Sequence, residues 1–167
     1  ETGYTPYLSS VVSDVFLGNL TYFKRRSERS VWSFSLKYFS LGEIDILENP
    51  LDIPVVESPN EFTIDAGYGL KLNDNFSMGI TGRFLLSDVK LQSFNSETEV
   101  ATSFAVDISG FFQSNTFQLG DNDAIYRAGF NISNLGPKMK YSELGEENFI
   151  PSNLRLGNGI AVSYTHL

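Results

Sequence analysis

A regular alternation of apolar and polar residues on both sides of a short polar turn sets the strongest limit on the fold of this chain. Every second residue is apolar over residues 62–72, and the alternation resumes over 76–84 after the turn Asn-Asp-Asn at 73–75. Residues that repeat with a period of two lie on one face of a β-strand. The stretch therefore predicts a β-hairpin with one apolar and one polar face.

Seven segments of the chain, this hairpin included, have the character of strands, and no helical period is evident. Several are about 10–17 residues long, above the roughly 5–6 typical of soluble strands and sufficient for the roughly 9–11 of a tilted membrane strand. The expected strands are residues 14–24, 30–46, 61–72, 76–90, 102–113, 126–135 and 153–164.

Links of different length connect these segments. The links 25–29 and 73–75 are short, 47–60, 91–101 and 136–152 are long, and 114–125 is intermediate. Short links at one end of the strands and long links at the other are typical of outer-membrane barrels. The pattern predicts an all-β fold, an antiparallel up-and-down transmembrane β-barrel. A soluble β-sandwich or closed barrel is the alternative.

Composition narrows the classes of function. The 167 residues suffice for a single domain, and a net charge of −8 argues against nucleic acid as a partner. The chain has no cysteine and one histidine, His166. We therefore expect no catalytic residue, no metal site and no cofactor, and no enzymatic activity. No apolar run approaches the roughly 20 residues of a membrane helix.

Four charged residues of alternating sign lie on the polar faces of consecutive expected strands. They are Asp65, Arg83, Asp107 and Arg127. Arginine facing lipid at mid-depth costs about 2–4 kcal/mol, so these side chains are expected to face the interior of a barrel. We expect them to pair into a structural charge ladder, with a ligand-binding or substrate-conducting interior as the sharper alternative.

Several stretches resemble the PorV family of the type IX secretion system, whose members have a FadL-like fold. The stretches are GYTPYLSSVVSDV (3–15), YFSLGEI (38–44), PNEFTIDAGYGLKLNDNFSMGI (59–80), FNISNLGPKMKY (130–141) and FIPSNLRLG (149–157). The resemblance covers about residues 1–160. It implies that residues 1–167 are one partial barrel domain, about half of a fourteen-stranded barrel, with further strands on either side. The closing VSYTHL (162–167) is similar to translated sequencing-adapter sequence, and we expect it to be foreign.

The resemblance also implies a function and a location. PorV-like proteins lie in the outer membrane of Gram-negative bacteria of the Bacteroidota. They receive secreted cargo proteins bearing a C-terminal signal domain from the translocon channel, and pass them to the sortase complex at the surface. The alternative is a FadL-like outer-membrane transporter of a hydrophobic small molecule. An enzyme that modifies lipid A is a third class, for which these residues offer no visible nucleophile or base.

The long links combine acidic and apolar residues and would lie outside the cell in the usual barrel orientation. We expect them to dock cargo or sortase, with ordinary solvated loops as the alternative. The candidate residues are Glu48, Asp52, Glu57, Glu143, Glu146, Glu147 and Phe149.

Overall fold

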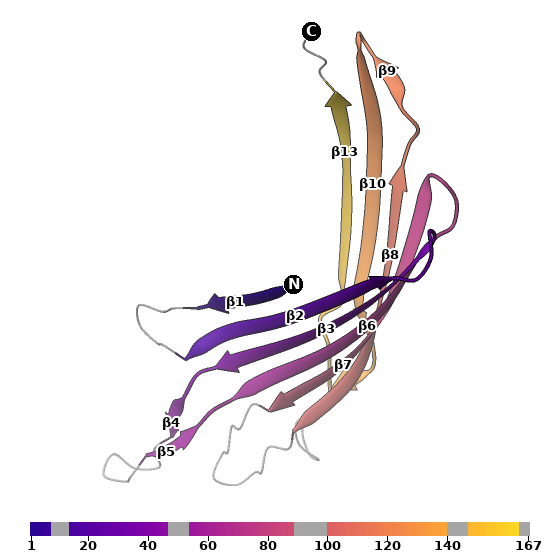
Figure 1. Ribbon diagram of the computed structural model, residues 1–167. Coiled ribbons are helices and arrows are strands. Elements are labelled where there is room, and N and C mark those ends of the chain that lie inside the picture. Colours follow the sequence, from indigo (N-terminus) through magenta and orange to yellow (C-terminus); the bar gives the residue numbers. More distant parts are fainter. Residues whose placement is uncertain (8–13, 47–53, 89–99, 140–146, 164–167) are drawn as a thin grey trace.

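The computed structural model describes residues 1–7, 14–46, 54–88, 100–139 and 147–163, and within these ranges the only regular elements are β-strands. Figure 1 shows them as one long, strongly curved sheet with small additions at its ends. The strands are β1 Thr2–Pro6, β2 Val15–Arg25, β3 Ser30–Leu41, β4 Ile44–Ile46, β5 Val55–Glu57, β6 Asn60–Lys71, β7 Phe76–Asp88, β8 Ala101–Gln113, β9 Phe117–Leu119, β10 Asn122–Leu135, β11 Lys138–Met139, β12 Asn148–Phe149 and β13 Asn153–Ser163.

The main sheet has the order β1-β2-β3-β6-β7-β8-β10-β13, with β9 paired to β10. Every pair is antiparallel, and the long strands follow one another as an up-and-down meander. The sheet is open in the described part of the chain, because β1 and β13 form its two edges and do not pair with each other. The pairs β4–β5 and β11–β12 form two separate small sheets.

All seven expected strands are present, but the described residues form thirteen strands instead of seven. The segment 30–46 divides into β3 and β4, because Gly42 has a positive φ of 85° and the chain leaves the sheet there. The expected links contain β5, β9, β11 and β12, and β1 precedes the first expected strand. These elements have two to five residues, too few for an alternation to identify them.

The opening hairpin forms as predicted. β6 and β7 pair from Asn60↔Asp88 to Lys71↔Ser77. The connection is closed by the side chain of Asn73, whose Oδ1 accepts from the backbone N–H groups of Asn75 (2.9 Å) and Phe76 (2.8 Å). An asparagine that binds backbone groups two or three residues ahead is a common turn device.

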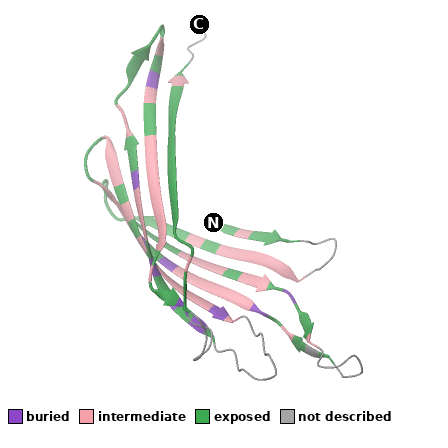
Figure 2. Ribbon diagram, turned by 180° about the vertical axis from the view of Figure 1, so that it is seen from behind, coloured by how far each residue is buried: buried purple, intermediate pink, exposed green. Residues whose placement is uncertain are grey.

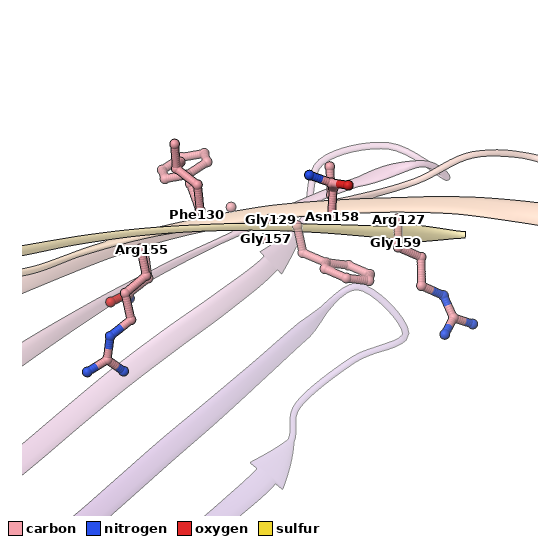
Figure 3. A pocket seen from close by; sticks show the side chains of 12 residues that line it. Arg127, Gly129, Phe130, Arg155, Gly157, Asn158 and Gly159 are labelled. Atoms are coloured by element: carbon pink, nitrogen blue, oxygen red, sulfur yellow. The ribbon is translucent and has the colours of Figure 1, made fainter. Parts of the chain in front are cut away.

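The register gives the sheet two faces of different character. Even-numbered residues of the long strands up to Ile132 share one face, which we call the apolar face, and odd-numbered residues share the other. In Figure 3 the labelled Phe130 and Asn158 point to one side of the sheet, whereas Arg127 and Arg155 point toward the side where the other strands lie. The odd-numbered residues therefore line the concave face.

The sheet has hardly any core in the ordinary sense. Figure 2 shows that buried positions are few and scattered among intermediate and exposed ones. The buried apolar residues of the described ranges are Ala101, Ala105, Ala124 and Met139, whereas many large residues of the apolar face are exposed. A β-sandwich buries its apolar face against a second sheet, and no described segment covers this one. The described residues therefore do not form a sandwich.

Aromatic side chains gather at both ends of the apolar face. Near the turns that follow β2, β6 and β8, the rings of Trp32 and Tyr68 lie 4.9 Å apart, and Tyr22 is exposed. At the other end, Phe16 lies 5.9 Å from Tyr38. Between the two groups on β3 and β6 lie Leu36, Ile64 and Ala66 together with one aromatic residue, Phe34, so on these strands a mainly aliphatic band separates two aromatic belts.

Candidate functional site: a charged network on the concave face

A network of charged and polar side chains crosses the concave face from β3 to β10. It comprises Lys37, Ser35, Asp65, Arg83, Asp107 and Asn134. Arg83 lies at its centre, because Nε donates to Asp65 Oδ1 at 2.7 Å and Nη2 donates to Asp107 Oδ2 at 3.1 Å. One guanidinium therefore joins carboxylates from two neighbouring strands.

The ladder of strand pairs explains why these side chains meet. Asp65 lies directly opposite Arg83 and also directly opposite Ser35, whose Oγ donates to Asp65 Oδ2 at 2.9 Å. Arg83 faces Ala105 on β8, and this small side chain leaves the guanidinium free to reach Asp107, the diagonal neighbour. Directly opposite and diagonal pairs are the contacts that stabilise antiparallel sheets.

Burial makes the central part of the network stronger than its rim. The side chains of Asp65 and Asp107 are 8% and 14% exposed, and that of Arg83 is 16% exposed. Lys37 Nζ lies 3.3 Å from Asp65 Oδ2, but its side chain is 44% exposed. Exposed ion pairs contribute about 0–1 kcal/mol, whereas removing one partner of a buried pair leaves an uncompensated charge.

Asn134 connects the network to the segment that follows β10. The ladder between β8 and β10 shifts register between Ile132 and Leu135, and within this bulge Asn134 has a positive φ of 60°. Its side-chain oxygen accepts from Arg83 Nη1, and its backbone N–H donates to Asp107 Oδ1 at 2.8 Å. Asparagine adopts this left-handed conformation more readily than most residues.

The structure brings together three of the four charged residues expected to form a ladder. Arg127 shares their face, but its Nε donates to Gln113 Oε1 at 3.1 Å, and no ion pair of the described residues includes it. Lys37 and Asn134 were not expected in the network. Lys37 alternates on the polar face like the others, whereas Asn134 depends on a bulge, which alternation does not reveal.

A second feature of the concave face is a shallow hollow of about 540 Å³ between β8, β10 and β13. Arg127 and Arg155 lie at two of its sides, Gly129 and Gly157 lie between them, and Gly159 lies opposite Arg127 (Figure 3). The hollow adjoins β13, an edge of the sheet, and is open.

The expected partner-binding residues are placed only in part. Glu57 ends β5, Glu147 is exposed, and Phe149 in β12 is 66% exposed, with Lys138 Nζ 5.1 Å from the centre of its ring. The others, Glu48, Asp52, Glu143 and Glu146, lie outside the described residues.

The described residues contain no cluster of three or more histidine, cysteine, aspartate or glutamate side chains positioned to hold a metal ion. None of the described segments is a helix with the length and apolar character needed to cross a membrane.

Comparison with known proteins identifies the family. A comparison with curated proteins gave no match. The family model described as "Type IX secretion system protein PorV" matches residues 1–166, nearly the whole chain. This agrees with the resemblance carried by the motifs. The chain belongs to the PorV family of the type IX secretion system.

Proposed function

We propose that this chain forms part of an outer-membrane β-barrel that carries secreted proteins within the type IX system. The observation that carries the proposal is the distribution of polarity over the sheet. The broad apolar face is exposed, and the charges at mid-strand lie buried among themselves on the concave face. This is the reverse of a soluble protein and fits a wall with lipid outside and polar groups inside.

Two further observations support a membrane-spanning wall. The long strands have 11 to 14 residues, enough for the roughly 9–11 that a tilted membrane strand needs. Aromatic belts at both ends of the apolar face correspond to the aromatic girdles at the two membrane surfaces. We propose a FadL-like barrel of fourteen strands in the outer membrane, to which this chain contributes about half.

In this barrel the strand ends Leu41, Asn60, Asp88, Ala101 and Leu135 mark the end with the long links, which we call the long-link end. It would face the cell exterior, and the turn at 73–75 would face the periplasm. The protein would receive cargo bearing a C-terminal signal domain from the translocon channel and pass it to the sortase complex. It would do so by binding alone, without catalysis.

The proposal is tested by recovering the tagged intact protein from its native outer membrane after chemical cross-linking, with mass spectrometry of the proteins that accompany it. Cargo proteins together with sortase subunits are the expected result. If neither accompanies the protein, it is not a carrier. Recovery of lipid alone would instead favour transport of a small molecule.

A pair of variants locates the contact. Phe149→Ala removes an exposed aromatic side chain close to the long-link end, and Leu119→Ala removes an exposed apolar side chain on β9, near the opposite end. We expect Phe149→Ala to reduce the cargo recovered and Leu119→Ala to leave it unchanged. Equal recovery from both variants would show that Phe149 is not part of the docking surface.

A further inference from the structure

Burial places the strand pair β11–β12 on the concave side of β8, because the concave-face residues at the start of β8 are covered whereas Phe104 on the apolar face is 65% exposed. β11 contacts β8, and Met139 of β11 is only 6% exposed. The concave-face positions at the start of β8 are small and covered, since Ala101, Ser103 and Ala105 are 2%, 4% and 3% exposed. Small side chains there let a neighbouring backbone approach closely.

Gly136 is the point of closest approach. A Cβ atom at this position would overlap the carbonyl oxygen of Phe104 and lie 3.2 Å from the Cα atom of Ala105. Both obstacles are backbone atoms of β8, which cannot rotate away. Residue 136 therefore has to be glycine for the segment to lie on β8 in this way.

Asn134 joins both ends of this segment to the charged network. Its Nδ2 donates to the carbonyl oxygen of Pro151 at 3.0 Å, and Ser152 Oγ donates to the carbonyl oxygen of Asn134 at 3.1 Å. The same residue is bound to Arg83 and Asp107 on the other side. The chain before β11 and the chain after β12 are thus tied to one point on the concave face.

We propose that Asn134 is a positioning residue that holds the β11–β12 pair inside the concave face, so that the pair obstructs the interior near the long-link end. The obstruction rests on the proposed barrel, whereas the holding rests on these contacts alone. The buried network then does more than stabilise the wall, because Arg83 and Asp107 fix the position of Asn134, which holds the β11–β12 pair.

Cysteine labelling tests the holding directly, because the chain has no cysteine of its own. Met139→Cys places a thiol at the buried position of the pair, and Phe149→Cys places one at its exposed position. Labelling of the intact protein with a small water-soluble maleimide should be at least tenfold slower at 139 than at 149.

Two variants then release the pair by different routes. Asn134→Gly keeps the left-handed backbone but loses the side-chain bonds to Arg83 and Pro151, and Gly136→Ala drives the segment off β8. Each should accelerate labelling at 139 severalfold and leave labelling at 149 unchanged. Arg127→Met is the matched control, because it removes a hydrogen bond of the concave face that lies outside the network and should change neither rate.

Equal labelling of 139 and 149 in the parent, or an unchanged rate at 139 in both variants, would overturn the proposal. The obstruction is measured as uptake of a small sugar by vesicles that contain the intact protein. Asn134→Gly should raise uptake severalfold, and unchanged uptake despite faster labelling would overturn this part. Failure of the unmodified protein to insert into vesicles is scored first and counts against the proposed barrel, not against the role of Asn134.

Discussion

An arginine placed at mid-strand on the apolar face would measure whether that face lies in lipid. Val106 is the suitable position, because it lies on the apolar face near the centre of β8 and is 38% exposed. In water, replacing a partly exposed valine by arginine changes stability by only about 0.5 kcal/mol. At the centre of a bilayer the same change costs about 2–4 kcal/mol.

The magnitude depends on depth, which provides a matched control in the same strand. Thr102 lies on the same face as Val106, four residues closer to the long-link end. Four residues span about 13 Å along a strand, or roughly 10 Å of depth at the usual tilt. An arginine at 102 therefore reaches the membrane surface, where its cost falls to about 0–1 kcal/mol.

The assay is equilibrium unfolding of the intact protein in lipid vesicles with increasing denaturant. Val106→Arg should lower the folding equilibrium constant by about 30- to 900-fold, and Thr102→Arg by less than about tenfold. Similar small losses for both variants would refute the assignment of the apolar face to lipid. Similar large losses would show that the cost comes from local packing and not from depth.

Three further outcomes follow from the described contacts. Arg83→Met should lower the free energy of unfolding by about 3 kcal/mol in the same assay, because two largely buried carboxylates lose their partner. Arg127→Met should lower it by about 0.5 kcal/mol, and equal losses for the two variants would contradict the placement of the network. Gly110→Ala should cost about 1–3 kcal/mol, because the added methyl group meets an aromatic ring on the neighbouring strand; an unchanged midpoint would contradict this packing. The hydrogen bond from Lys71 lowers the pKa of Asp74 below its ordinary 3.8, so the pair stabilises the turn above that pH and ceases to do so as pH falls through the folded pKa. Carbon NMR of the carboxyl group should show the pKa of Asp74 rising in Lys71→Met, and an unchanged value would mean that the pair does not form.

The sequence predicted the sheet well because its two faces differ so regularly. In β6 and β7 the polarity of each residue indicates the face on which it lies. The hairpin, its turn and the placement of Asp65 opposite Arg83 could therefore be predicted from the alternation of apolar and polar residues. Short strands such as β9 and β11 carry too few residues for such a count.

The candidate site was predictable only where the ladder is regular. Asp107 joins the network, as expected of an odd-numbered residue on the concave face, but Arg127 does not. An odd number indicates the face of the sheet on which a side chain lies, not its position along the strand. Asn134 enters through a bulge that shifts the register by one residue, so its part in the network could not be read from alternation.

The neighbouring residues Gly110 and Phe111 of β8 have a consequence for the folding of this wall. On the apolar face the ring of Phe130 from β10 occupies the space above Gly110, and on the concave face the ring of Phe111 lies beside Gly129 of β10. Each strand thus places one aromatic ring beside a glycine of the other strand, and the two contacts lie on opposite faces of the sheet. A slip of β10 along β8 by two residues would keep every side chain on its proper face. It would, however, move both rings away from the glycines beside which they lie. The alternation of apolar and polar residues does not exclude such a slip. The two ring–glycine contacts do exclude it, so they fix the register of β10 on β8, next to the edge strand β13.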